Sequence, residues 1–117
     1  MKLSEIVNIL EATVLVGNDQ LDKEITRGGA ADLMSDILAG LSDECIFLTG
    51  LTTIQAVRTA LVADVSAVVF VRSKNPPKEV IELAKEQNVP VLISPYSMFV
   101  SCGRLHAKGI TGLDGKT

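Results

Sequence analysis

Three short apolar segments in the second half of the chain constrain its fold most strongly. They are Cys45–Thr49, Ala67–Val71 and Val89–Ile93. Each is followed by a stretch whose apolar residues recur at helical spacing, and these stretches are Thr53–Ala63, Pro76–Gln87 and Ser97–His106. Strands that are apolar on both faces are typical of parallel sheets, because helices cover both faces of such a sheet. The alternation therefore predicts repeated βαβ units in an α/β fold of three-layer type around a parallel core sheet.

Composition sets the size of the domain and excludes several classes of partner. The chain has 117 residues, of which 47% are hydrophobic and only 3% aromatic, so we expect one domain with an aliphatic core. We place this domain at residues 1–106 and expect residues 107–117, which lack a periodic apolar face, to form a flexible tail. Eleven basic and fourteen acidic residues give a net charge of −3, which argues against binding to nucleic acid or to a membrane surface.

The sequence also predicts a cytoplasmic location. No apolar run is long enough to span a membrane, and Met1–Glu11 has a single basic residue and no signal-peptide pattern. Cys45 and Cys102 follow no CxxC spacing, so we expect both to be reduced thiols.

The first half of the chain is predicted from shorter patterns. Apolar residues fall on one helical face of Met1–Glu11, with Ser4 as a plausible N-cap. Ala12–Val16 is a β-rich segment closed by a turn, and Leu21–Thr26 is predicted as a second extended segment.

Two adjacent glycines, Gly28 and Gly29, separate that extended segment from the next predicted helix. We expect this helix to begin at the capping residue Asp32 and to end near Gly40. Its apolar positions are Leu33, Met34, Ile37, Leu38 and Leu41. Because glycine has no Cβ, the pair can serve a tight strand-to-helix turn or can let another chain or a ligand come close. The pattern is compatible with both interpretations.

Ligands of open α/β sheets bind beyond the carboxyl ends of the strands, which selects three loops in this chain. The loops offer hydroxyl groups, two cationic side chains and the N–H groups of helix starts, a combination suited to a small anion or a phosphate. The candidate ligand-binding residues are Thr49, Gly50, Thr52, Thr53, Arg72, Lys74, Ser94, Tyr96 and Ser97. Ordinary helix capping by Thr52, Thr53 and Ser97 explains part of the same pattern.

We predict no catalytic residue, no metal site and no cofactor. His106 is expected to be a charge at the end of the last helix and Cys102 a core thiol. Neither Cys102 nor Cys45 has a histidine at a spacing suited to a catalytic base. Asp32 and Asp36 lie one helical turn apart, but two carboxylates near a helix start are explained by the helix dipole.

The residues around the glycine pair resemble the DRTGG domain family. The resemblance rests on Asp22-Lys23-Glu24-Ile25-Thr26-Arg27-Gly28-Gly29 and on the helix that follows, Asp32-Leu33-Met34-Ser35-Asp36. The strings Thr49-Gly50-Leu51-Thr52-Thr53 and Ser94-Pro95-Tyr96-Ser97 look like the family's other recurrent segments. The name-giving letters correspond to Asp22, Thr26, Gly28 and Gly29, with Lys23 where an arginine is expected. Lysine keeps the charge but loses the bidentate guanidinium, so no role that depends on the guanidinium is carried over.

The resemblance extends from residue 1 to about residue 106 and implies a fold similar to the N-terminal domain of HPr kinase/phosphorylase. It also implies a regulatory or oligomerising role. In multidomain relatives the module stands beside nucleotide-sensing CBS domains in a pyrophosphatase, or ahead of phosphotransacetylase. The family has no established catalytic residues, so the resemblance assigns none here.

We therefore expect a non-catalytic regulatory module that forms a homodimer and senses a small anionic or nucleotide-like metabolite. The alternative is a pure protein–protein interaction domain that acts on a partner enzyme without a small-molecule ligand. A small enzyme that uses the loop hydroxyls is a third possibility, for which no nucleophile–base pair is evident. The candidate interface residues are Thr26, Arg27, Gly28, Gly29 and Asp32, because exposed glycine backbone lies between two opposite charges.

Overall fold

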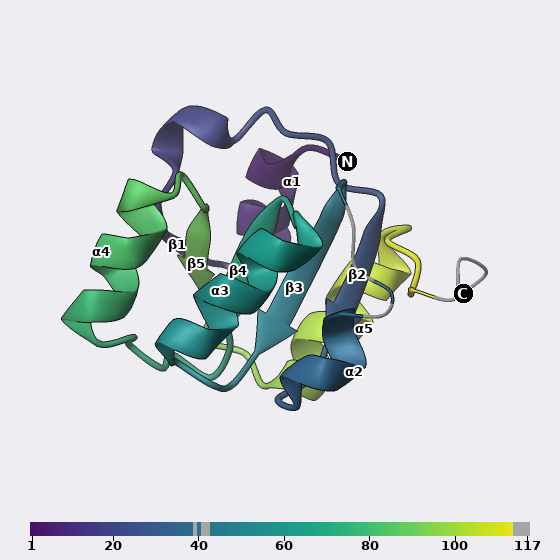
Figure 1. Cartoon of the computed structure of the whole chain (residues 1–117). Coiled ribbons are helices and arrows are strands. Elements are labelled where there is room, and N and C mark those ends of the chain that lie inside the picture. Colours follow the sequence, from purple (N-terminus) through teal and green to yellow (C-terminus); the bar gives the residue numbers. More distant parts are fainter. Residues whose placement is uncertain (39, 41–42, 114–117) are drawn as a thin grey trace.

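A five-stranded sheet lies at the centre of the computed structural model (Figure 1), which describes residues 1–38, 40 and 43–113. The elements follow the order α1 (Leu3–Ile9), β1 (Thr13–Val16), the 3₁₀ helix η1 (Asn18–Gln20), β2 (Arg27–Ala30), α2 (Met34–Leu38), β3 (Cys45–Thr49), α3 (Ile54–Ala63), β4 (Ala67–Phe70), α4 (Lys78–Glu86), β5 (Val91–Ile93) and α5 (Met98–Ala107). The strands lie in the order β1-β5-β4-β3-β2. Strands β2 to β5 are mutually parallel, and β1 pairs antiparallel with β5.

The predicted parallel core is confirmed. Strands β3, β4 and β5 are adjacent, and every residue of β3 and β4 is buried. Alternate residues of β4 serve the two faces of the sheet: Val68 and Phe70 join one apolar cluster, and Ala67 and Val69 join the other. Continuous apolar strands were therefore the correct signal for a sheet that is covered on both faces.

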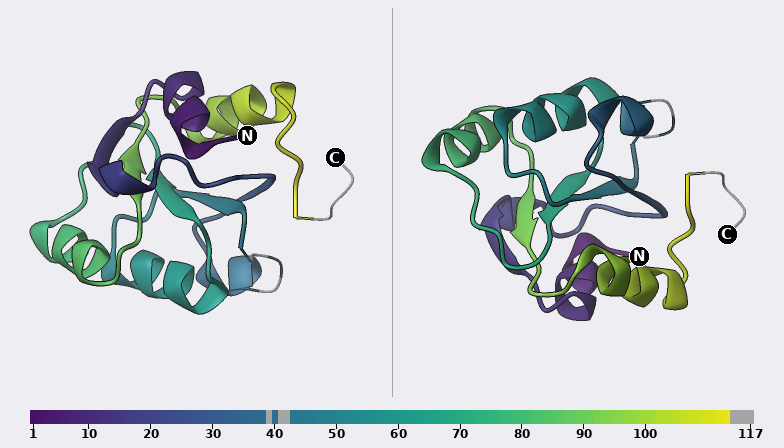
Figure 2. Two further views of the ribbon diagram at one scale, coloured as in Figure 1. Left: turned by 90° about the horizontal axis from the view of Figure 1, so that it is seen from above. Right: turned by 90° about the horizontal axis from the view of Figure 1, so that it is seen from below.

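Helices complete the three layers (Figure 2). Helices α2, α3 and α4 lie on one face of the sheet, and α1 and α5 lie on the other. Ala56, Val57 and Ala60 of α3 pack against the sheet, whereas the larger Leu61 is exposed. The reason is that α3 buries its small residues, which let the helix approach the strands closely.

Helix α1 begins two residues earlier than a cap at Ser4 requires. Lys2 precedes its first turn, and the Glu5 side chain accepts a hydrogen bond from the Lys2 N–H at 3.1 Å. Ser4 is thus a helical residue, and the expected cap was wrong.

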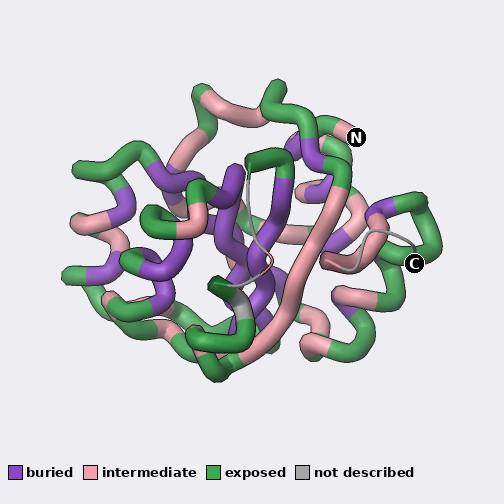
Figure 3. Tube along the Cα trace, turned by 45° about the vertical axis from the view of Figure 1, so that its right-hand side comes forward, coloured by how far each residue is buried: buried purple, intermediate pink, exposed green. Residues whose placement is uncertain are grey.

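Strand β2 is the main departure from the predicted elements. Gly28 and Gly29 lie inside this strand, paired with Ile46 and Phe47 of β3, and neither has a positive φ. The interpretation of these glycines as a strand-to-helix turn was therefore wrong. The extended segment predicted at Leu21–Thr26 is not a strand, since it begins with a turn and forms only an isolated bridge at Glu24. β2 is an edge strand, and its residues are only half-buried along the open side of the sheet (Figure 3).

The C-terminal segment also differs from expectation. Ile110 is buried, and Thr111 forms a parallel bridge with Arg27 on the outer edge of β2. A Cβ added to Gly29 would lie 2.7 Å from Cδ1 of Leu113, so the missing side chain makes room for this segment. The expected tail from residue 107 therefore packs against β2 as far as Leu113, and residues 114–117 lie outside the described part of the chain.

Helix α2 is shorter than predicted and starts at Met34 instead of directly after Asp32. Leu33 and Leu38, expected to face inward, are 62% and 45% exposed. Leu41 and the side chain of Ile37 lie outside the described residues.

Candidate functional site

The three loops predicted to bind a ligand lie together at the carboxyl ends of β3, β4 and β5. We call these loops, residues 49–53, 72–75 and 94–97, the rim. The Arg72 N–H donates to the carbonyl oxygen of Tyr96 at 2.8 Å, and the Lys74 ammonium donates to the carbonyl oxygen of Gly50 at 3.2 Å. The rim is thus one connected surface, and its ligand-binding role stays a prediction.

Asp32 belongs to the rim and not to the start of α2. Its carboxylate accepts hydrogen bonds from the Thr49 hydroxyl at 3.1 Å and from the Gly50 N–H at 2.8 Å. The Thr49 hydroxyl oxygen in turn accepts from the Leu51 N–H at 3.1 Å. Asp32 therefore fixes the loop after β3 and brings a negative charge to this part of the rim.

Most hydroxyl groups of the third rim loop are engaged within the protein. The buried Ser94 hydroxyl donates to the carbonyl oxygen of Leu10 at 2.9 Å, and the Tyr96 hydroxyl donates to the Glu11 carboxylate. Ser97 caps α5, as predicted, by accepting from the Val100 N–H at 3.2 Å. These side chains hold α1 and α5 to the rim, so their first role is structural.

The second rim loop holds two residues in an unusual backbone conformation. Arg72 and Ser73 have φ values of 62° and 55°, in the left-handed region that side chains disfavour. The Ser73 N–H donates to the carbonyl oxygen of Ser94 at 2.8 Å, so hydrogen bonds to the third loop hold this conformation. The exposed Arg72 and Lys74 side chains are the positive charges of the rim.

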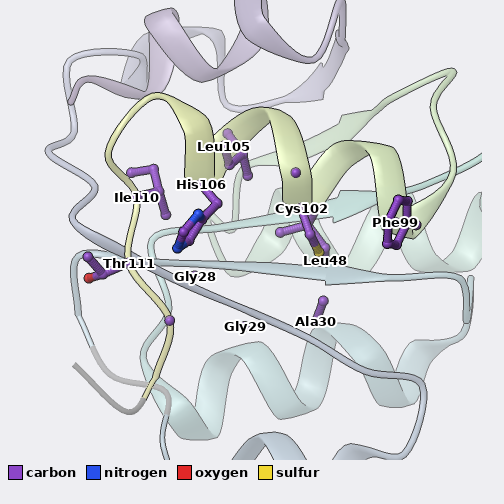
Figure 4. Close-up of a pocket in the computed structure, with 12 residues that line it drawn as sticks. Gly28, Gly29, Ala30, Leu48, Phe99, Cys102, Leu105, His106, Ile110 and Thr111 are labelled. Carbon is purple, nitrogen blue, oxygen red and sulfur yellow. The ribbon is translucent and has the colours of Figure 1, made fainter. Parts of the chain in front are cut away.

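A separate pocket of about 360 Å³ lies between β2 and α5 (Figure 4). Its walls are mostly apolar or lack side chains. The residues that line it are Gly28, Gly29, Ala30, Leu48, Phe99, Cys102, Gly103, Leu105, His106, Ile110, Thr111 and Gly112. We call it the β2–α5 pocket.

The β2–α5 pocket contains two of the predicted interface residues and none of the predicted ligand-binding residues. Gly28 and Gly29 form part of its wall. Thr26 precedes β2, Arg27 begins it, and Asp32 follows its end at the rim. The predicted interface residues therefore lie along the edge strand β2 and just before and after it. Whether a partner contacts that edge stays a prediction.

Sequence reasoning missed the contribution of α5 to this pocket. Phe99, Cys102 and His106 recur at helical spacing and line the pocket together with the buried Leu105, whereas Ser101 is buried and does not line it. Phe99 is 88% exposed. A second helical face in Ser97–His106 was the available signal, but a cysteine and a histidine among apolar residues suggested only a core thiol and a terminal charge.

Cys102 is partly buried in the pocket wall, and desolvation raises the pKa of its thiol above the ordinary value. The thiol is therefore protonated near neutral pH, which makes it a poor nucleophile. In the part of the chain that the structure describes, no three histidine, cysteine or acidic side chains are grouped to hold a metal ion. Nor does any described helix have the length and apolar character needed to cross a membrane.

Replacing Gly103 with alanine should stabilise the protein by about 0.5–1 kcal/mol, because glycine is a poor residue within a helix. A Cβ at this position would meet no atom within 4 Å. Chemical denaturation of the Gly103→Ala variant and the wild type checks this. A destabilised variant would mean that this side of α5 is filled and that the pocket is not open there.

The fold and the site can be compared with known proteins. The crystal structure of the CBS and DRTGG domains of the regulatory region of a Clostridium perfringens pyrophosphatase, complexed with the activator diadenosine tetraphosphate, matches with a TM-score of 0.74 and 21% sequence identity. The match covers 94% of this chain but 47% of that one, so this chain spans about half the length of its structural neighbour. At this identity the likeness shows a shared fold.

Comparison of the sequence with curated proteins found no match. The sequence model of the DRTGG domain matches residues 5–107, which is most of the chain and includes β2, the rim and α5. This chain is a member of the DRTGG domain family.

Proposed function

We propose that the chain is a non-catalytic, cytoplasmic regulatory module that acts by association, as a homodimer, and whose rim senses a small anionic or nucleotide-like metabolite. The observation that carries this proposal is the match of nearly the whole chain to the regulatory region of a pyrophosphatase. That region was crystallised with a nucleotide activator, diadenosine tetraphosphate. A module with the same fold is suited to a regulatory role whether or not it shares the activator.

The side chains favour regulation over catalysis. The protonated Cys102 thiol lacks the thiolate character that a nucleophile needs. The rim hydroxyls of Ser94 and Tyr96 donate to Leu10 and Glu11, so they are engaged in holding the fold. We therefore assign recognition to this module and catalysis to a partner enzyme.

The rim is the proposed site for the metabolite. Arg72 and Lys74 are exposed there, beside the first turns of α3 and α5, whose N–H groups add positive potential. The carboxylate of Asp32 lies next to Gly50, so an anion would be expected nearer to Arg72 than to the loop after β3. This arrangement makes Arg72 the residue on which binding should depend most.

A thermal-shift screen with nucleotides and phosphorylated metabolites tests this function. A compound that binds only the native state raises stability by about 2.7 kcal/mol at a hundredfold excess over its dissociation constant. Replacing Arg72 with alanine should weaken binding of such a compound at least tenfold, because a charge-assisted hydrogen bond contributes roughly 1.5–3 kcal/mol. Arg58→Ala is the matched control, since Arg58 is an exposed arginine within α3.

Equal affinity in the wild type and the Arg72→Ala variant would remove the rim from the proposal. A screen in which no compound shifts the transition favours the second candidate, an interaction domain that acts on a partner enzyme without a ligand. The apolar β2–α5 pocket and the exposed Phe99 support that candidate.

A further inference from the structure

The solvent-facing side of α5 is apolar, which is unusual for a helix that covers a sheet. Phe99 and Val100 are 88% and 40% exposed, and Gly103 and Ala107 are exposed on the same side of the helix. Figure 2 shows α5 beside α1 in the outer layer on its face of the sheet. A surface helix normally turns charged and polar residues toward the water. An apolar outer face therefore indicates a surface that another apolar group covers.

The charged side chain of α5 is directed away from this face. Arg104 is the only lysine, arginine or acidic residue between Met98 and Ala107. Its guanidinium lies 4.1 Å from the centre of the Tyr96 ring and donates to the carbonyl oxygen of Ile9 at 3.1 Å. These contacts hold the guanidinium near the end of α1. The cost of burying its charge therefore does not oppose association through the apolar face.

The same helix face contains a hole. Gly103 lies in the middle of α5, where glycine lowers helix stability relative to alanine, and a Cβ there would meet no described atom within 4 Å. Phe99, Cys102, Gly103 and His106 lie at i, i+3, i+4 and i+7, and all four line the β2–α5 pocket (Figure 4). Four residues at this spacing form the hole that receives a side chain from a facing helix.

We propose that two copies of the chain associate through α5, with Phe99 of each copy inserted into the β2–α5 pocket of the other. The two α5 helices run antiparallel about a twofold axis beside Val100, because this axis carries Phe99 of one copy onto the hole between Cys102 and Gly103 of the other. The ring enters over Gly103, where the pocket has no side chain. Residues 110–112, which also line the pocket, stay in place, and the outer edge of β2 takes no part.

This association rests on the proposed function, which it deepens by assigning the surface through which the module pairs. A second copy is favoured over an unrelated partner because one helix face carries both halves of the contact, an exposed ring and a hole that receives a ring. A twofold interface is self-complementary in this way, and closed twofold pairs are the commonest oligomers. Of the predicted interface residues, Gly28 and Gly29 line the same pocket and contact the inserted ring.

Sedimentation equilibrium of the full chain over a dilution series tests this surface. Phe99→Ala removes the inserted ring, and Gly103→Leu fills the hole that receives it. Each substitution should raise the dimer dissociation constant by roughly tenfold to a hundredfold, as expected for a buried aromatic anchor. Val62→Ala is the matched control, because Val62 is 77% exposed on α3, on the other face of the sheet. This control should leave the dissociation constant unchanged, and circular dichroism verifies that all three variants are folded.

A mixture of the two interface variants tests the geometry of the contact. The Phe99→Ala chain keeps an open hole, and the Gly103→Leu chain keeps the ring that fits it. A pair formed from one chain of each kind therefore retains one complete insertion, whereas neither variant can form an insertion with itself. The mixture should associate more tightly than either variant alone. A mixture that associates no more tightly than its components would overturn the insertion of Phe99 into the pocket.

Two further results separate this surface from the proposed function. A wild type that dimerises, with a dissociation constant that neither Phe99→Ala nor Gly103→Leu changes, overturns the surface and leaves the proposed function intact. A wild type that is monomeric at high micromolar concentration overturns both this surface and association as the mode of action.

Discussion

Replacing Phe47 with alanine will lower the free energy of unfolding by about 3–5 kcal/mol. Phe47 is fully buried in the middle of β3 and belongs to the apolar cluster between the sheet and helices α2, α3 and α4. Removing its ring deletes buried apolar surface and leaves a cavity that close-packed neighbours fill only in part. Urea denaturation monitored by circular dichroism measures the change.

Phe99→Ala is the control for this prediction, since it makes the same substitution at a phenylalanine that is 88% exposed. The Phe99→Ala substitution should change the free energy of unfolding of the monomer by less than about 0.5 kcal/mol. Both variants must be compared at a concentration where the chain is monomeric, because association adds to the apparent stability. A Phe47→Ala variant as stable as Phe99→Ala would contradict the assignment of Phe47 to the core.

The second large effect is expected at Gly17. Replacing this residue with alanine should lower the free energy of unfolding by about 2–5 kcal/mol. Gly17 has a φ of 99°, which side chains rarely adopt, and an added Cβ would lie 2.8 Å from Cβ and 2.9 Å from Cα of Pro90. Backbone at that distance cannot rotate away as a flexible side chain can. The substitution should therefore strain the turn after β1 and disturb its pairing with β5.

Gly109→Ala separates backbone strain from the steric clash. Gly109 has a similar φ of 106°, but a Cβ there would meet nothing within 4 Å. The Gly109→Ala substitution should lower the free energy of unfolding by only about 1–2 kcal/mol, because it adds the penalty of the left-handed conformation and no clash. Denaturation curves for both variants check the difference, and equal losses would mean that Pro90 yields without cost.

The parallel core of the fold could be predicted because its signals are local. β3, β4 and the helices after them are recognisable from continuous apolar runs and from helical spacing within a few residues. β2 carries no such signal, since arginine, two glycines and alanine have little preference for strands. It is a strand because β3 pairs with one side of it and Thr111 with the other.

The positions of Asp32 and of the C-terminal segment depend on contacts distant in sequence. Asp32 has the local pattern of a helix cap, but Thr49 and Gly50 provide the donors that its carboxylate accepts. Ile110 and Leu113 are isolated apolar residues among glycines, a pattern typical of a tail. They pack because Gly28 and Gly29 leave space for them on either face of β2. The prediction of a rim was possible because the carboxyl ends of parallel strands meet at one edge, whereas the β2–α5 pocket requires the folded position of α5.

Amide chemical shifts measured by NMR, with and without a compound that raises the thermal transition, test the central claim most directly. The account predicts that the largest changes fall on the rim, at residues 49–53, 72–75 and 94–97. The Gly28 N–H, which donates to Thr111 on the outer edge of β2, serves as the internal control and should change little. Changes confined to the residues that line the β2–α5 pocket, with the rim unchanged, would contradict sensing at the rim.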